Sequence, residues 1–242
     1  MIKKLMGLVV VVALVGGAAV WWFVLRDDAP EELSVDSGSS TTEGDADGSS
    51  AGATPESFDG TWTVETGGDT TAGFRITESF AGGLADHEAV GRSPEVAGSI
   101  TVAGSEVTEG SFTVDLTALE FTDDPGVPVA NRVRALQDRG LEIGTFPEAT
   151  FELTEPIDFG AVPGDGEVAT ATATGDLTIH GVTQSVTFDV DAKVEGAAIR
   201  IATSEPVPVV LADFDIEAPT GGPVASVSDE GSFEFLIVVT QA

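Results

Sequence analysis

Apolar and polar side chains alternate in short runs from about residue 58 to the C-terminus. The clearest case is residues 173–191, in which apolar residues occupy every second position on both sides of His180 and Gly181. Two alternating runs joined by a short glycine-containing turn predict a β-hairpin with one apolar and one polar face. A shift of one residue would expose the whole apolar row, so this hairpin sets the register for its neighbours.

Similar runs recur along this region, and each is bounded by Gly, Pro or Asp. Their apolar positions are Trp62 and Val64; Phe74 and Ile76; Ile100 and Val102; Phe112, Val114 and Leu116; Phe151 and Leu153; residues 168–174; Ile199 and Ile201; residues 207–214; and Phe233, Phe235, Ile237 and Val239. Many short alternating strands predict an all-β, antiparallel sandwich or barrel. Alternation with one apolar face throughout favours a sheet curled around a single interior.

One stretch, residues 129–141, has a helical period instead. Val129, Val133 and Leu136 are spaced as i, i+4 and i+7, and Gly140 follows them. This spacing predicts one short helix with these three residues on its buried face. Arg132 falls on another face of the predicted helix.

The N-terminal residues 1–26 have the character of a membrane anchor. Leu5 to Leu25 is an unbroken apolar run, preceded by Lys3 and Lys4, and about 20 such residues span the hydrocarbon core of a bilayer. A cleaved signal peptide is the alternative, although its apolar region is normally shorter. Because the lysines precede the run and acidic residues follow it, we expect a cytoplasmic N-terminus and an extracytoplasmic C-terminal domain.

Residues 27–56 are rich in Asp, Glu, Ser, Gly and Ala, which predicts a disordered acidic stalk between the anchor and a domain at 57–242. The whole chain has 41 acidic and 10 basic residues, a formal net charge of −31. This charge argues against nucleic acid as a partner and indicates a solvated acidic surface. The sequence indicates no particular oligomeric state.

Residues suited to catalysis are scarce. The chain has no cysteine and two histidines, His87 and His180, and it contains no G-x-S-x-G motif. We therefore expect no catalytic residues, no metal site and no cofactor, and we do not expect an enzyme. His87 lies among Ala85, Asp86 and Glu88 and is expected in a surface loop. His180 lies in the predicted hairpin turn, where its ring either bonds nearby backbone or contacts the polar head of a ligand.

Three motifs carry a resemblance to a known family: Gly73–Ile76, the segment from Arg139 to Phe151 containing Phe-Pro-Glu-Ala-Thr-Phe, and Gly175–Thr183, which reads Gly-Asp-Leu-Thr-Ile-His-Gly-Val-Thr. From about Phe58 onward the chain resembles the YceI-like family of extracytoplasmic β-barrels. These barrels are similar to lipocalins and bind polyisoprenoid or quinone-type lipids. Two departures are Asp69 and Glu78, where many members have histidines, and Arg132-Val133, where the helix usually has Arg-Asp.

The resemblance implies a lipid tunnel inside a lipocalin-like barrel. The residues expected to contact an isoprenoid or quinone-type chain are Phe74, Ile76, Phe112, Val114, Phe151, Leu177, Ile179, Phe188, Phe214, Phe233 and Phe235, and the head-group candidates are Arg132, Arg134 and His180. Thirteen Phe and no Tyr indicate interior rings that need no hydrogen-bond partner. A filled core is the alternative reading of the same rings. The protein would then be an interaction or adhesion module displayed on a stalk.

Overall fold

The computed structural model describes residues 29–38, 55, 57–65, 67–81, 86–125, 132–219 and 224–242. The predicted membrane anchor and most of the predicted stalk lie outside these residues. In the described part of the chain, no helix is both long and apolar enough to span a bilayer.

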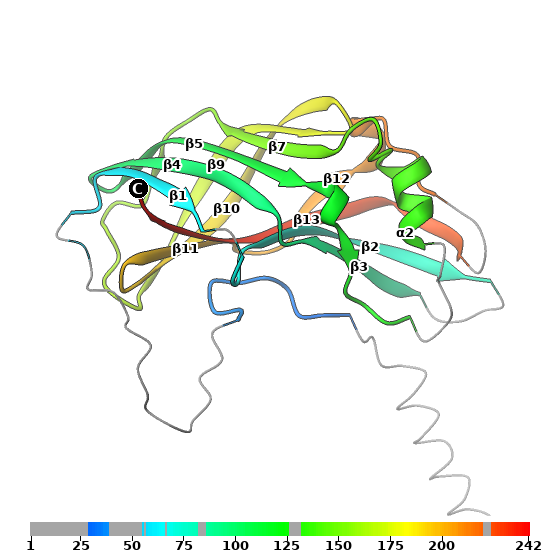
Figure 1. The fold of residues 1–242 in the computed structure, drawn as a ribbon, viewed down its shortest axis with the longest axis horizontal. Helices are drawn as coiled ribbons and strands as arrows, with labels where there is room; N and C mark the ends of the chain where they lie inside the picture. The colour runs from blue at the N-terminus through cyan, green and yellow to red at the C-terminus, as the bar shows by residue number, and fades with distance from the viewer. Residues whose placement is uncertain are drawn as a thin grey trace, which may run out of the picture.

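The described residues form an antiparallel β-sheet with short helical segments (Figure 1). Its strands are β1 (Gly60–Val64), β2 (Thr71–Phe80), β3 (His87–Ser93), β4 (Val96–Ala103), β5 (Glu106–Asp115), β6 (Glu120–Phe121), β7 (Glu148–Leu153), β8 (Ile157–Asp158), β9 (Val168–Ile179), β10 (Val182–Glu195), β11 (Ala198–Thr203), β12 (Val207–Val210) and β13 (Val224–Gln241). The helical segments are η1 (Leu116–Ala118), α2 (Arg132–Ala135), η2 (Leu136–Gly140) and η3 (Leu211–Phe214).

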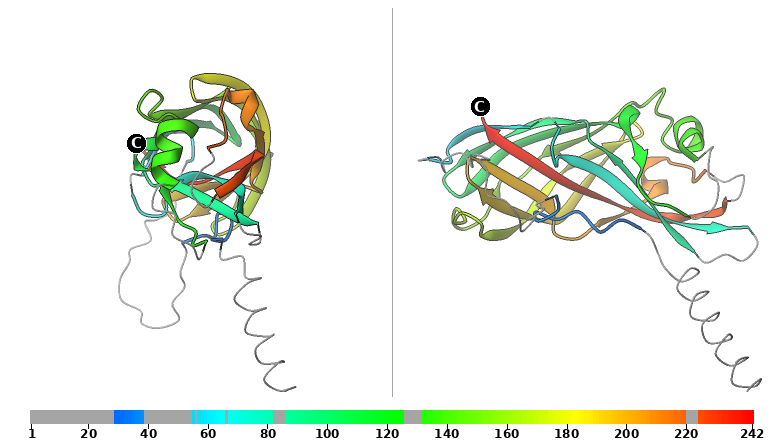
Figure 2. Two further views of the ribbon diagram at one scale, coloured as in Figure 1. Left: turned by 90° about the vertical axis from the view of Figure 1, so that its right-hand side faces the viewer. Right: turned by 60° about the horizontal axis from the view of Figure 1, so that its bottom comes forward.

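Eight of these strands close into a barrel. The order β1-β4-β5-β7-β9-β10-β11-β13 returns to β1, because one half of β13 pairs with β1 and the other half pairs with β2. Strands β3 and β6 extend the sheet beyond β2, at the end where α2 lies. Viewed from this end, the strands form a ring (Figure 2). The all-β antiparallel barrel with one short helix is confirmed.

The predicted hairpin is formed by β9 and β10, which pair in continuous register from Val182↔Ile179 to Lys193↔Val168. Its turn is the dipeptide His180-Gly181, with φ of 53° and 74°. Two successive positive φ angles are typical of the tight turn whose twist matches that of paired strands. A side chain at Gly181 would also place its Cβ 2.6 Å from Cε1 of Phe146, so glycine is required there.

The predicted helix is present over the described residues, but its buried face differs from the prediction, and Val129 lies outside the described residues. It begins at Arg132 within the described residues and continues as a π-type turn to Gly140. Val133 is 39% exposed, whereas Arg132 is 8% exposed. The prediction that Val133 faces the core is wrong, because carboxylates and an aromatic ring at the end of the barrel bind the arginine instead. The predicted strand over 207–214 also ends early, at Val210, where η3 begins.

Residues 29–38 differ most from the expectation. Part of the predicted disordered stalk lies across the outer face of the barrel, drawn in blue in Figure 1. Leu33 and Val35 are buried there against Ala202 and Leu236. The prediction of disorder over 27–56 is wrong for these ten residues, because composition alone does not reveal that two apolar side chains have a site on the barrel wall.

Candidate functional site

The barrel encloses an apolar cavity of about 690 Å³. Its lining extends from Phe58, Val107 and Phe159 at one end to Leu141 and Ile216 at the end where α2 lies. This volume falls in the range of about 300–1,000 Å³ that is typical of small-molecule sites. The interior of the barrel is therefore not completely filled by its own side chains.

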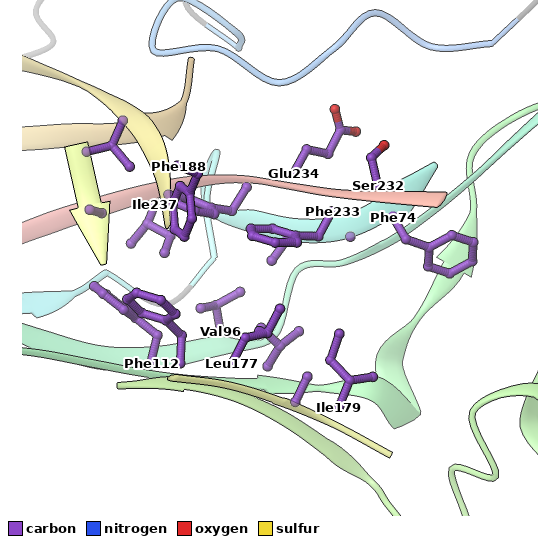
Figure 3. Close-up of a pocket in the computed structure, with 18 of the residues that line it drawn as sticks. Phe74, Val96, Phe112, Leu177, Ile179, Phe188, Ser232, Phe233, Glu234 and Ile237 are labelled. Carbon is purple, nitrogen blue, oxygen red and sulfur yellow. The ribbon is translucent and has the colours of Figure 1, made fainter. Parts of the chain in front are cut away.

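Strand alternation directs the apolar side chains into this cavity. Along β13, Phe233 and Ile237 point inward, whereas Ser232 and Glu234 point to the opposite face (Figure 3). Side chains alternate between the inner and outer faces in the same way along the other strands. As a result, every residue expected to contact the chain of a ligand lines the cavity: Phe74, Ile76, Phe112, Val114, Phe151, Leu177, Ile179, Phe188, Phe214, Phe233 and Phe235. That they bind a ligand stays a prediction.

Phe188 is the centre of an aromatic cluster on the cavity wall. Its ring lies edge-to-face with Phe151, Phe233 and Phe235, at centroid distances of 5.6, 5.3 and 6.1 Å. Gly175 makes room for one of these rings, because a Cβ at this position would lie 2.3 Å from Cζ of Phe151. Edge-to-face pairs of this kind add to the stability gained from burial alone.

A buried ionic cluster lies at the α2 end of the cavity. Glu78 is on the inward face of β2, two residues beyond Ile76, and both residues line the cavity. Arg132 donates from Nε to Glu78 Oε1 at 3.1 Å and from Nη1 to Asp123 Oδ2 at 2.6 Å, and its Nη2 lies 3.0 Å from Glu78 Oε2. Its guanidinium also lies 4.1 Å from the centroid of the Phe121 ring. Arg132 is thus held by two carboxylates and one aromatic face.

Asp123 is the buried anion of this cluster. Its Oδ2 lies 2.7 Å from His87 Nε2, and its Oδ1 accepts a hydrogen bond of 2.8 Å from the backbone N–H of Val90. Burial raises the pKa of Asp123, but the hydrogen bonds from Arg132, His87 and Val90 lower it more, so the net pKa lies below the usual value. His87, expected in a surface loop, is instead the first residue of β3 and part of this cluster.

The three head-group candidates have different positions. Arg132 lines the cavity, but Arg134 and His180 do not belong to its lining. The side chain of Arg134 is 80% exposed and pairs with Asp138 at 3.5 Å. Arg139 lines the cavity instead and is exposed. Arg132 and Arg134 are two residues apart on α2 and therefore point to different sides, whereas Arg139 lies within the π-type turn that follows.

His180 holds three segments together at the α2 end. Its Nε2 lies 2.8 Å from Glu142 Oε2, its Nδ1 lies 3.2 Å from the backbone oxygen of Phe214, and its ring packs edge-on against Phe146 at 4.5 Å. Among the described residues other than glycine, those with positive φ are Glu142, His180 and Asp215. All three meet here or adjoin this contact, so strained backbone is concentrated at one end of the barrel. His180 fixes the hairpin turn and does not line the cavity.

Sequence reasoning did not select Glu78 or Asp123 as site residues. For Glu78 the signal was present, since it continues the alternation of Phe74 and Ile76 and therefore had to point inward. Asp123 is in a loop and has no such signal. Among the described residues, no group of three or more His, Asp or Glu side chains is arranged to hold a metal ion.

Comparison with known proteins gives a family and a fold. A family model described as "YceI-like domain" matches residues 62–239. A polyisoprenoid binding domain from Saccharophagus degradans, implicated in plant cell wall breakdown, has a TM-score of 0.56 at 17% identity, over 76% of this chain and 99% of that chain. BcnA from Burkholderia cenocepacia has a TM-score of 0.48 at 18% identity, over 70% and 96% of the two chains. A mutant YceI protein from Campylobacter jejuni has a TM-score of 0.49 at 16% identity, over 63% and 84%. No curated protein matches the chain.

Proposed function

Because this chain belongs to the YceI-like domain family, we propose that it is a membrane-anchored, extracytoplasmic lipid-binding protein whose barrel holds a polyisoprenoid or quinone-like chain. The observation that carries the proposal is the apolar cavity of about 690 Å³ along the inside of the barrel. A displayed adhesion module would need no such cavity. Binding of this kind requires no catalytic residues.

The cavity lining suits a long apolar chain with a small polar end. Aromatic and aliphatic side chains line its length, and none of the rings carries a hydroxyl, because the chain has no Tyr. The charged residues Glu78 and Arg132 at the α2 end neutralise each other. An apolar chain in this cavity would therefore meet no unpaired charge from these two residues, and a polar head would lie beside them.

The membrane part of the proposal is supported by the sequence. Residues Leu5 to Leu25 are apolar and follow Lys3 and Lys4, and acidic residues follow Arg26. The positive-inside rule then directs the barrel away from the cytoplasm. Trp21 and Trp22 would lie near the outer interface, where such rings are enriched.

The test of lipid binding is direct. A protein containing residues 29–242, which keeps every contact described above, is purified without detergent, and its lipid extract is analysed by mass spectrometry. We expect a prenyl lipid in near-stoichiometric amount. A protein that is folded by circular dichroism and carries no prenyl lipid, and that binds none when it is offered, would leave the adhesion module as the better hypothesis.

The test of location uses the absence of cysteine from the chain. In intact cells, Ser39→Cys should react with a thiol reagent that does not cross the membrane. Protection of this cysteine until lysis would reverse the proposed orientation.

A further inference from the structure

Residues 29–38, called the strap below, cover a set of outward-facing residues that a barrel would normally expose to water. On β13, Glu234 and Leu236 alternate with the cavity-lining Phe233 and Phe235, and both are 1% exposed. Arg75 on β2 and Arg200 on β11 are each 5% exposed. Burial of charged residues on the outer wall is costly unless each has a partner, so the strap and this wall are complementary.

Arginine side chains of the barrel hold the strap by its backbone. Arg75 Nη2 donates to Pro30 O at 2.6 Å, and Arg92 Nη2 donates to Glu31 O at 2.6 Å. Arg200 donates to the backbone oxygens of Val35, at 2.7 Å, and Ser37.

One carboxylate and one lysine of the barrel, Glu234 and Lys193, also bind the strap. Glu234 Oε2 accepts a hydrogen bond of 3.1 Å from the N–H of Leu33, and Lys193 Nζ lies 2.9 Å from Asp36 Oδ1. Four of the ten basic residues in this acidic chain thus bind the strap, namely Arg75, Arg92, Lys193 and Arg200.

The strap runs in a defined direction along the barrel. Pro30, near its beginning, contacts Arg75, three positions before Glu78 on β2, and Glu78 belongs to the ionic cluster at the α2 end of the cavity. Its last residue, Gly38, lies against Asp69, which precedes β2 at the opposite end of the barrel. Figures 1 and 2 show this blue segment running lengthwise along the outside of the barrel, with one end on the side of α2. The strap therefore begins on the side of the barrel's α2 end, and this beginning is the part of the strap that follows the predicted anchor in the sequence.

We propose that the strap replaces a long stalk by a short tether and holds the α2 end of the barrel toward the membrane, so that the cavity exchanges its lipid with the bilayer in which the protein is anchored. The proposal rests on the membrane anchoring and lipid binding proposed above. Four residue steps separate Leu25 from Ala29, a reach of at most about 14 Å. A free stalk of 30 residues would have a mean end-to-end distance of about 30 Å and would impose no orientation.

The experiment uses the full chain in lipid vesicles with an energy acceptor on the lipid head groups. A fluorophore is placed on a single introduced cysteine, either Arg134→Cys on exposed α2 or Ala197→Cys in the exposed turn at the opposite end. We expect greater energy transfer from position 134 than from position 197.

Two changes should abolish this difference by separate routes. Leu33→Ser with Val35→Ser removes the buried side chains of the strap. An insertion of about 20 Gly and Ser residues between Asp28 and Ala29 leaves the barrel and the strap intact but lengthens the tether to roughly 25 Å. Glu32→Ser, at an exposed strap position, is the matched control and should keep the difference.

The outcomes separate this proposal from the one on which it rests. If the native chain floats with the vesicles but shows equal transfer from both positions, or if the insertion leaves the difference unchanged, the orienting strap is refuted, while lipid binding and anchoring stand. If the native chain does not float with the vesicles, the anchoring itself fails and the orientation fails with it. The prenyl-lipid content, measured on the same samples, reports on the cavity independently of both.

Discussion

Replacement of Phe188 by Trp tests whether the barrel interior is a binding cavity or an incompletely packed core. The phenylalanine ring contacts three other rings at 5.3–6.1 Å and is 8% exposed. In a solid core, a larger side chain at such a position strains its neighbours by about 1–3 kcal/mol. Here, the added ring has the cavity of about 690 Å³ to occupy.

We therefore expect a small effect on stability and a large effect on binding. The indole keeps an aromatic face toward Phe151, Phe233 and Phe235, so most of the edge-to-face contacts are retained. The main cost is the indole N–H, which has no acceptor among these rings, and this amounts to about 1 kcal/mol. The prenyl lipid that co-purifies with the protein should fall sharply, because the indole fills the path of its chain.

Phe188→Leu is the matched control, since it shortens the side chain and leaves the cavity open. It loses the three ring contacts, each of which contributes about 0.5–1.5 kcal/mol, and should destabilise the protein by roughly 2–3 kcal/mol. Its lipid content should stay near that of the native chain. Denaturant unfolding and lipid mass spectrometry on both variants measure the two effects separately. A Trp variant that is the less stable of the two and still carries its full lipid would refute the reasoning.

Other predictions concern the turn, the ionic cluster and the strap. Gly181→Val should lower the free energy of unfolding by more than about 1 kcal/mol, because the φ of 74° is unfavourable for a branched residue; an unchanged denaturant midpoint would contradict this. Arg132→Met should lower the free energy of unfolding by about 3–5 kcal/mol at neutral pH, because it removes the cation that pairs with the buried Glu78 and Asp123 carboxylates; denaturant unfolding measures this loss. Since the folded-state pKa of Asp123 is depressed, its ionised carboxylate stabilises the fold fully above its unfolded pKa of about 3.9, and this stabilisation is lost as the pH falls through the lower folded value. Asp123→Asn should remove this part of the pH dependence of the free energy of unfolding, measured in a pH series of unfolding curves. A protein that begins at Ser57 should melt below one that begins at Ala29, and equal melting temperatures would show that the strap adds no net stability.

The alternation of apolar residues was sufficient to determine the barrel strands and the direction in which their side chains point. A strand has a strict period of two, so Phe74, Phe112, Phe188 and Phe233 had to share the inner face once the sheet was closed. The turn at His180-Gly181 could also be predicted from the local sequence, because a tight hairpin needs residues that accept positive φ. Neither feature depends on which distant segments meet.

Tertiary structure alone decided the features that join distant segments. The presence of a cavity depends on how completely the inward side chains fill the barrel, and a list of inward residues does not give that volume. Arg132 is buried although helical spacing placed it on another face, because β2 and the loop after β6 bring Glu78 and Asp123 to it. Residues 29–38 read as an acidic linker, yet they are ordered because arginines from three separate strands hold their backbone, and no local pattern in the linker encodes those partners.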